Sequence, residues 1–248
     1  MNQARFRFYE ELNDFLPASR KKQVFSHPFH GNPSVKDLIE SMGVPHTEVD
    51  MILVNGESVD FSYKVSSADL ISVYPVFECL DISDVQHLRA QPLREIKFVA
   101  DVHLGRLVKY LRLLGFDTVY DRELSDSEIV NTSVSQRRII LTRDKGLLKN
   151  RKVTHGYWIR ATDPRIQIKE IVSKFDLKDH LKPFSRCLRC NSLIVDVLKD
   201  EIAYKLLPKT RKYYNQFQIC PDCRRIYWEG SHYDKMKQFI ESLYLPGK

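Results

Sequence analysis

Along residues 1–80, apolar and polar positions alternate in short runs, which predicts β-strands around a segment with helical spacing. That segment begins after Ser34, a residue suited to cap a helix, and Gly43 is placed to end it. The pair Asn55-Gly56 lies between two apolar runs and predicts a tight hairpin turn. Strands are predicted at 4–12, 23–29, 51–60 and 69–78. This order of strands and helix is that of a β-grasp domain.

From residue 94 to 180 the pattern changes to short apolar runs that alternate with helical spacing. The first helix is expected to end at Gly115. The second opens with Ser125 and Glu128, which form a capping box. Strand–helix alternation predicts a parallel sheet and the α/β class. The predicted helices are 102–115, 125–137 and 163–175, and the predicted strands are 95–101, 116–121, 138–144 and 153–160.

The predicted organisation has three segments, 1–80, 94–180 and 181–248, with residues 81–93 as a linker. Their charges differ: residues 1–90 contain 8 Lys+Arg and 13 Asp+Glu, residues 91–180 contain 18 and 12, and the rest contains 13 and 7. The resulting net charges of −5, +6 and +6 sum to the +7 of the chain. A basic body favours a nucleic-acid partner, because phosphate neutralisation supplies most non-specific affinity, although solubility alone would also explain it.

Carboxylates follow the predicted strands of the central segment. Asp101, Asp121 and Asp144 each end a strand, and Asp126 lies in the first turn of a helix. Because parallel α/β sheets bind ligands beyond the carboxyl ends of their strands, we expect the four side chains to converge. Crowded carboxylates favour Mg²⁺ or Mn²⁺, which can activate water for phosphodiester hydrolysis. Basic residues expected to bind the substrate backbone are Arg106, Lys109, Arg112, Arg143 and Lys145.

These acids also have structural interpretations. Acidic residues are common at helix N-termini, which fits Asp126, and Asp121 could cap a turn. Glu128 is interpreted as a capping partner rather than a ligand. Two other enzyme classes fit poorly. A haloacid-dehalogenase phosphatase needs a second Asp where His103 stands. A nucleotide hydrolase of the P-loop type needs a G-x-x-x-x-G-K-[ST] phosphate loop, and the sequence has none.

Two C-x-x-C pairs in the third segment are the strongest local signal. They are Cys187 with Cys190 and Cys220 with Cys223, a spacing that suits a tetrahedral Zn²⁺ in a zinc ribbon. So short a segment has little core of its own, so the zinc is expected to be structural. A redox-active dithiol is the alternative, and Cys79 is interpreted as a buried thiol. Arginines expected to offset the charge of the site are Arg186, Arg189, Arg224 and Arg225.

Aromatic residues gather around the second cysteine pair. Trp228, His232 and Tyr233 could stack on bases or reach the acidic centre. For Trp228 we favour packing of the ribbon against the central segment, and His232 is kept as a substrate-binding candidate. The run LLPKTRKYYNQF interleaves basic and aromatic residues, which suits single-stranded RNA or, alternatively, a solvated hairpin.

The central segment resembles the Mut-seven C-terminal RNase domain, a PIN-like family, in FVADVHLGRLVKYLRLLGFDTVYDRELSDSEIV and RIILTRDKGLL, and the tail matches in W-x-G-S-H-Y. The resemblance implies a nuclease whose metal-binding acids are Asp101, Asp126 and Asp144. PIN nucleases usually add a Glu from an earlier helix, for which Asp121 is the candidate substitute here.

The first segment resembles the ubiquitin-like domain that precedes such RNase domains, in SVKDLIESMGVP, ILVNGESVDFSYKV and ISVYPVFE. Related sulfur carriers need a free Gly-Gly carboxyl terminus, whereas this segment runs on into more chain. Docking of a protein partner is therefore expected instead.

The sequence as a whole predicts a ribonuclease with catalytic Mg²⁺ or Mn²⁺ and a structural Zn²⁺. The alternative is a non-catalytic RNA-binding adaptor with a decayed nuclease site. RNA is the predicted partner, and DNA stays open. No run approaches the roughly 20 apolar residues that span a bilayer, and the N-terminus lacks a secretory core, so a cytoplasmic location and no membrane partner are expected. Oligomeric state is not predicted.

Overall fold

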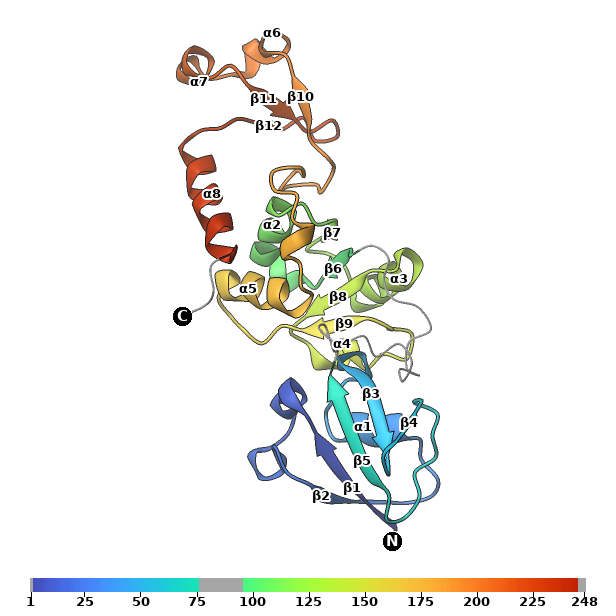
Figure 1. Ribbon diagram of the computed structural model, residues 1–248. Coiled ribbons are helices and arrows are strands. Elements are labelled where there is room, and N and C mark those ends of the chain that lie inside the picture. The colour runs from blue at the N-terminus through green and yellow to red at the C-terminus, as the bar shows by residue number, and fades with distance from the viewer. Residues whose placement is uncertain (1, 76–95, 245–248) are drawn as a thin grey trace. The chain divides into compact units, whose positions relative to one another are not determined.

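The computed structural model describes residues 2–75 and 96–244 (Figure 1). The chain divides into two compact units. Unit 1 combines Met1–Glu95 with Ser125–Trp158, and unit 2 combines Ile96–Leu124 with Ile159–Lys248. The predicted linker and Cys79 lie outside the described residues.

The first part of unit 1 is a five-stranded mixed sheet, drawn in blue and cyan in Figure 1. Its elements are β1 (Asn2–Phe8), η1 (Glu10–Phe15), η2 (Ala18–Arg20), β2 (Phe25–Phe29), α1 (Val35–Ser41), η3 (His46–Glu48), β3 (Val49–Val54), β4 (Glu57–Val59) and β5 (Leu70–Pro75), where η marks a 3₁₀ helix. The strand order is β2-β1-β5-β3-β4. β1 and β5 pair in parallel, and the other neighbours are antiparallel. This is the β-grasp arrangement that the sequence predicts.

Local signals account for these elements. The Ser34 side chain accepts a hydrogen bond from the Asp37 backbone, and the Asp37 side chain accepts one from the Ser34 backbone, so both caps of a capping box are made. Gly43 ends the helix at a φ of +99°, a conformation that favours glycine. Asn55 and Gly56 take φ of +53° and +95° in the turn between β3 and β4. The predicted cap, stop and turn are all confirmed.

The predicted strand at 4–12 is wrong in its second half. β1 ends at Phe8, and η1 follows. Leu12 and Phe15 are both buried. Strand alternation puts residues three apart on opposite faces, whereas a 3₁₀ helix with three residues per turn puts them on the same side. The helix therefore buries both side chains where a continued strand would expose one.

The second part of unit 1 contains α3 (Asp126–Gln136), β8 (Ile139–Thr142), α4 (Lys145–Leu148) and β9 (Gly156–Trp158). β8 and β9 pair in parallel, with Thr142 opposite Trp158. The capping box of Ser125 and Glu128 is confirmed at the start of α3. The sequence did not predict α4, because four residues are too few to show a helical period.

Buried polar groups join the two parts of unit 1. Glu48 is 2% exposed, and its Oε1 accepts a hydrogen bond of 2.6 Å from the backbone nitrogen of Trp158. The His46 ring lies between Glu40, at 2.6 Å, and the carbonyl oxygen of Val153, at 2.8 Å. Buried groups of this kind are costly to leave without partners. The β-grasp sheet is therefore an integral support of β9 rather than a loosely tethered module.

Replacing Glu48 by Ala is expected to lower the free energy of unfolding of unit 1 by about 2–3 kcal/mol, because the Trp158 nitrogen loses a charged acceptor in a buried position. Glu48→Gln keeps an oxygen acceptor and should lose less. Urea unfolding followed by Trp158 fluorescence in a Trp228→Phe background measures both. The exposed Glu57→Ala is the control, and an equal loss there would contradict the assignment.

Unit 2 contains a parallel strand pair and a small antiparallel sheet, and its last element is a helix. Its elements are β6 (Phe98–Ala100), η4 (Val102–Leu104), α2 (Gly105–Leu113), β7 (Thr118–Val119), α5 (Pro164–Lys174), η5 (Lys178–His180), β10 (Val195–Val197), α6 (Lys199–Ile202), η6 (Ala203–Lys205), α7 (Pro208–Tyr213), β11 (Phe217–Ile219), β12 (Ile226–Tyr227) and α8 (Ser231–Tyr244). β6 pairs with β7 in parallel, which together with β8 and β9 confirms the α/β class. The small sheet has the order β10-β11-β12.

Most of the core of unit 2 lies around α2. α2 packs against α5, and the buried Phe98 ring of β6 stands 5.8 Å from the ring of Phe175, just beyond α5. The small sheet has a much smaller core, whose buried members are Ile202, Phe217 and Ile219. The run LLPKTRKYYNQF is not a hairpin: Pro208 opens α7, because its fixed φ suits the first turn of a helix.

Candidate functional site

The four cysteines of the third segment come together. Their sulfur atoms all lie within 4.8 Å of one another, and Cys187 and Cys220 are buried. The shortest distances join different pairs: 3.4 Å from Cys187 to Cys223, and 3.3 Å from Cys190 to Cys220. A tetrahedral zinc with Zn–S bonds of about 2.3 Å needs sulfurs about 3.8 Å apart. The quartet could therefore bind zinc, and a redox couple within one C-x-x-C pair does not explain the cross-pairing.

The two C-x-x-C turns have the same backbone geometry. The nitrogens of Asn191 and Arg224, which follow the second cysteine of each pair, donate to the carbonyls of Cys187 and Cys220 at 3.0 Å. Both residues have positive φ, +75° for Asn191 and +58° for Arg224. Asn tolerates this conformation better than Arg does. The repeated turn presents the four thiols to one point.

Burial and hydrogen bonds give the four thiols different pKa values. Burial raises the pKa of Cys190, but hydrogen bonds with the side chain and backbone of Ser192 outweigh it and lower the pKa to about 6. Burial and bonds with the neighbouring thiols raise the pKa of Cys223 to about 12. The Tyr227 hydroxyl donates to the Cys187 sulfur at 3.1 Å. The sequence did not single out Tyr227, and its position right after the second pair was the one available signal.

Arg112 holds the first cysteine turn to α2. The guanidinium is 4% exposed and donates to the carbonyl of Thr118 at 2.8 and 3.1 Å, and to the carbonyl of Arg189 at 2.7 Å. Burial lowers its pKa, while Cys187 and Cys190 oppose that shift. Our expectation that Arg112 binds substrate is therefore wrong. Its helical spacing with Lys109 indicated a shared polar face but could not show that the third segment covers Arg112.

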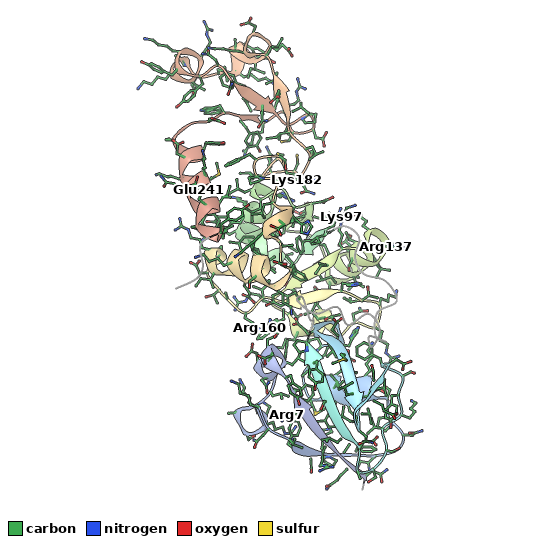
Figure 2. All side chains as sticks on the ribbon, viewed as in Figure 1. Arg7, Lys97, Arg137, Arg160, Lys182 and Glu241 are labelled. Carbon is green, nitrogen blue, oxygen red and sulfur yellow. The ribbon has the colours of Figure 1, made fainter. Side chains whose placement is uncertain are left out.

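The loop before the first cysteine turn strengthens this attachment. Lys182, labelled in Figure 2, donates from its backbone nitrogen to the carbonyl of Leu114 at 2.9 Å. The Arg186 Nε donates to the carbonyl of Gly115 at 3.0 Å. Gly115 has a φ of +94°, and a Cβ there would stand 2.3 Å from the Lys182 oxygen. Glycine therefore ends α2 and admits the loop at the same point.

Arg112→Leu is expected to lower the free energy of unfolding of unit 2 by about 2–4 kcal/mol, because the buried carbonyls of Thr118 and Arg189 lose their donors. Lys109→Met on the exposed face of the same helix is the control and should change stability by less than about 0.5 kcal/mol. Urea unfolding followed by circular dichroism compares them. Similar losses in both variants would show that Arg112 does not have this role.

Two of the predicted acids belong to unit 2. In the parallel pair, Val99 lies opposite Val119, and Asp101 and Asp121 each follow two residues later. Both therefore leave the same, carboxyl edge of the pair. Asp101 is 6% exposed, while Asp121 is exposed and accepts a hydrogen bond of 3.1 Å from the backbone nitrogen of Glu123.

The other two acids belong to unit 1. Asp144 follows the carboxyl end of β8 and caps α4, accepting from the Gly146 nitrogen at 2.7 Å. Asp126 is the first residue of α3, but Ser125 and Glu128 form its cap, so capping does not explain Asp126. Only residues 137–138 join α3 to β8, and the helix packs against the strand. The helix and the strand therefore run in opposite directions. Asp126 thus lies on the side of the carboxyl end of β8, as Asp144 does.

The predicted substrate-binding side chains are mostly exposed. Arg106 and Lys109 lie on the open face of α2, and Arg143 and His232 are also exposed. Lys145 is only partly exposed: its Nζ stands 4.1 Å from the centre of the Trp158 ring and 4.8 Å from that of Phe15. This cation–π clamp orders the residue next to Asp144.

Trp228 does not show the burial expected of a packing anchor, since it is 40% exposed.

The acids and the cysteines are two chemically different sets of possible metal ligands along the chain. Carboxylate oxygens suit Mg²⁺ or Mn²⁺, and thiolates suit Zn²⁺. Within the described residues, every helix is too short or too polar to span a bilayer.

Two crystal structures of small archaeal modifier protein 1 from Haloferax volcanii match at 12% and 14% identity, with TM-scores of 0.25 and 0.24. They cover 30% of this chain and 98% and 96% of their own. No curated protein matches the chain.

Two family models match. The Mut7-C ubiquitin model covers residues 1–81, and the Mut7-C RNAse domain model covers residues 96–240, more than half of the chain. This match supports a nuclease-like role in general. With its ubiquitin-like domain followed by the RNAse domain, the chain belongs to the Mut7-C RNAse domain family.

Proposed function

We propose that this protein is a metal-dependent ribonuclease whose metal is bound by Asp101, Asp121, Asp126 and Asp144. The observation that supports it most is that the parallel strands β6, β7 and β8 are each followed by one of these acids, Asp101, Asp121 and Asp144. The carboxyl edge of such strands is where α/β sheets bind ligands. Membership in an RNAse domain family makes a phosphodiester the natural substrate.

The acidic side chains would bind the metal, and the basic side chains would bind the substrate. A bound Mg²⁺ or Mn²⁺ would supply an activated water and stabilise the charge that develops on the phosphodiester. The acids would hold the ion, with Asp101 as the buried member of the set. Arg106, Lys109 and Arg143 would neutralise neighbouring phosphates and orient the backbone, and His232 is a further candidate for a phosphate contact. Four zinc-binding thiolates persist best in a reducing compartment, so we also propose the cytoplasm.

Cleavage of labelled single-stranded and structured RNA tests the proposal. Zinc-loaded protein is assayed with Mg²⁺, with Mn²⁺ and with neither, because a chelator such as EDTA would also remove zinc from the thiolates. We expect cleavage only with Mg²⁺ or Mn²⁺, and a DNA strand of the same sequence shows whether the 2′-hydroxyl is required. Cleavage that is equal without either ion would contradict metal dependence.

A non-catalytic RNA-binding adaptor is the second candidate. It is favoured by the backbone hydrogen bonds that occupy two of the acids, Asp121 with Glu123 and Asp144 with Gly146. The same assay separates the candidates. Tight RNA binding with no cleavage in either metal would make the adaptor the better interpretation.

A further inference from the structure

Unit 2 contains a groove in its zinc-ribbon part with a volume of about 630 Å³. Ribbon strands, the first turns of α8 and the loop before the first cysteine turn contribute its lining. The volume is within the roughly 300–1,000 Å³ range of sites for small ligands. None of the four predicted acids lines it, so it is a separate feature of the molecule.

Aromatic rings form part of the lining. Trp228 is partly open to solvent, and Phe184 packs on Tyr233 with ring centres 4.4 Å apart. Phe184 has a φ of +60°, an unfavourable backbone conformation for a bulky residue that often accompanies a functional site. Flat aromatic faces in a groove are the platforms on which proteins stack nucleobases.

Polar side chains of the groove offer both donors and acceptors. The Asn215 amide oxygen accepts from Lys199, and the Gln218 amide nitrogen donates to Asp196. Each bond uses one of the two polar atoms of that amide, so the other atom suits the edge of a base. Lys199 adds a positive charge for a phosphate.

The C-terminal part of the chain that contains the groove is rich in exposed apolar and basic side chains. Of the eleven exposed large hydrophobic side chains among the described residues, seven lie between positions 193 and 228. Two of them carry a lysine over the ring: Lys205 at 5.3 Å from Tyr204, and Lys212 at 5.5 Å from Tyr213. Residues 181–248 have a net charge of +6. Interleaved cations and aromatic rings favour a single-stranded nucleic acid over an apolar protein partner.

We propose that this groove binds unpaired bases of the RNA substrate, with one base stacked on Trp228. The inference rests on the proposed ribonuclease function and assigns the zinc ribbon the task of holding the strand. Paired bases would be excluded because their faces are covered within the helix, so the enzyme would prefer single strands or loops.

Tryptophan fluorescence tests this directly, because the chain has two tryptophans and Trp158 lies in unit 1. A short oligouridylate is titrated into zinc-loaded protein without Mg²⁺ or Mn²⁺, so that it is not cleaved. We expect saturable quenching in the wild type and none in Trp228→Phe, where Trp158 alone reports. An abasic strand of equal length should quench little, because it offers phosphates without bases.

Affinity measured by fluorescence anisotropy completes the test. Trp228→Ala should bind about tenfold more weakly, whereas Trp228→Phe, which keeps a ring, should bind within about threefold of the wild type. Tyr244→Ala removes an exposed aromatic ring outside the groove and should bind normally. Zinc content and circular dichroism establish that each variant is folded.

The outcomes separate this inference from the ribonuclease proposal. RNA binding without quenching, or with equal affinity in Trp228→Ala, overturns the inference, and metal-dependent cleavage would still stand. Quenching and selective loss in Trp228→Ala without any cleavage supports the base-binding groove and rejects the nuclease.

Discussion

Asp101→Asn and Asp144→Asn are each expected to lower metal-dependent RNA cleavage by about 10²–10³-fold while RNA affinity and zinc content stay near those of the wild type. Each change removes one negative ligand from the proposed Mg²⁺ or Mn²⁺ site and keeps the shape of the side chain. A bound metal supplies several kcal/mol of transition-state stabilisation, and each 1.36 kcal/mol is a factor of about ten in rate. Single-turnover cleavage with saturating protein measures the chemical step.

Asparagine suits position 144 because it can keep the local contact of the side chain. Asp144 caps α4 through a bond from the Gly146 nitrogen, and an asparagine oxygen can accept the same bond. Glu123→Gln is the matched control, since it removes an exposed negative charge between Asp121 and Asp126 that has no proposed role. A rate loss in the control as large as in the Asp variants would mean that general charge, rather than ligation, controls the rate.

Asp121→Asn tests whether Asp121 is a fourth ligand of the proposed metal. Asp121 is the candidate for the position that PIN nucleases fill with a Glu from an earlier helix. A loss comparable to that of Asp101→Asn is expected if Asp121 binds the metal. A small loss would confine its role to the turn in which it accepts from the Glu123 nitrogen.

Features of the fold that depend on neighbouring residues could be predicted from the sequence. The capping boxes at Ser34 and Ser125, the turn at Asn55-Gly56 and the two cysteine pairs each act within a few residues, so their signals are complete in the local sequence. The succession of strands and helix along the β-grasp segment is predictable for the same reason, because its turn and its helix ends have strong local signals.

Features that depend on distant residues could not be predicted. Arg112 has the same spacing on α2 as Arg106 and Lys109, and its burial against the carbonyls of Thr118 and Arg189 distinguishes it. The cation–π contacts of Lys145 with Phe15 and Trp158 likewise depend on residues far from it in the sequence, and its predicted role in substrate binding stays a prediction. Local periodicity reports which face a residue occupies but not what covers that face.

Loss of zinc is expected to unfold the ribbon and leave unit 1 folded. The small sheet buries only a few apolar side chains, Ile202, Phe217 and Ile219, so little else holds it together. Structural zinc contributes about 10–16 kcal/mol of apparent binding energy in zinc-finger peptides, far more than such a core provides. Hydrogen exchange by mass spectrometry should show β10, β11 and β12 losing protection in Cys220→Ser, while β1, β3 and β5 keep theirs.

The fifth cysteine offers the matched control. Cys79→Ser should retain one zinc per chain and wild-type exchange, because Cys79 is outside the two C-x-x-C pairs. If Cys220→Ser kept both the zinc and the ribbon's protection, the quartet would not be a metal site. RNA binding adds a second consequence: because the proposed base groove is built on the ribbon strands, Cys220→Ser should lose RNA affinity as well as zinc. A variant that lost zinc and still bound oligouridylate as tightly as the wild type would place the RNA elsewhere, even with the structural role of zinc upheld.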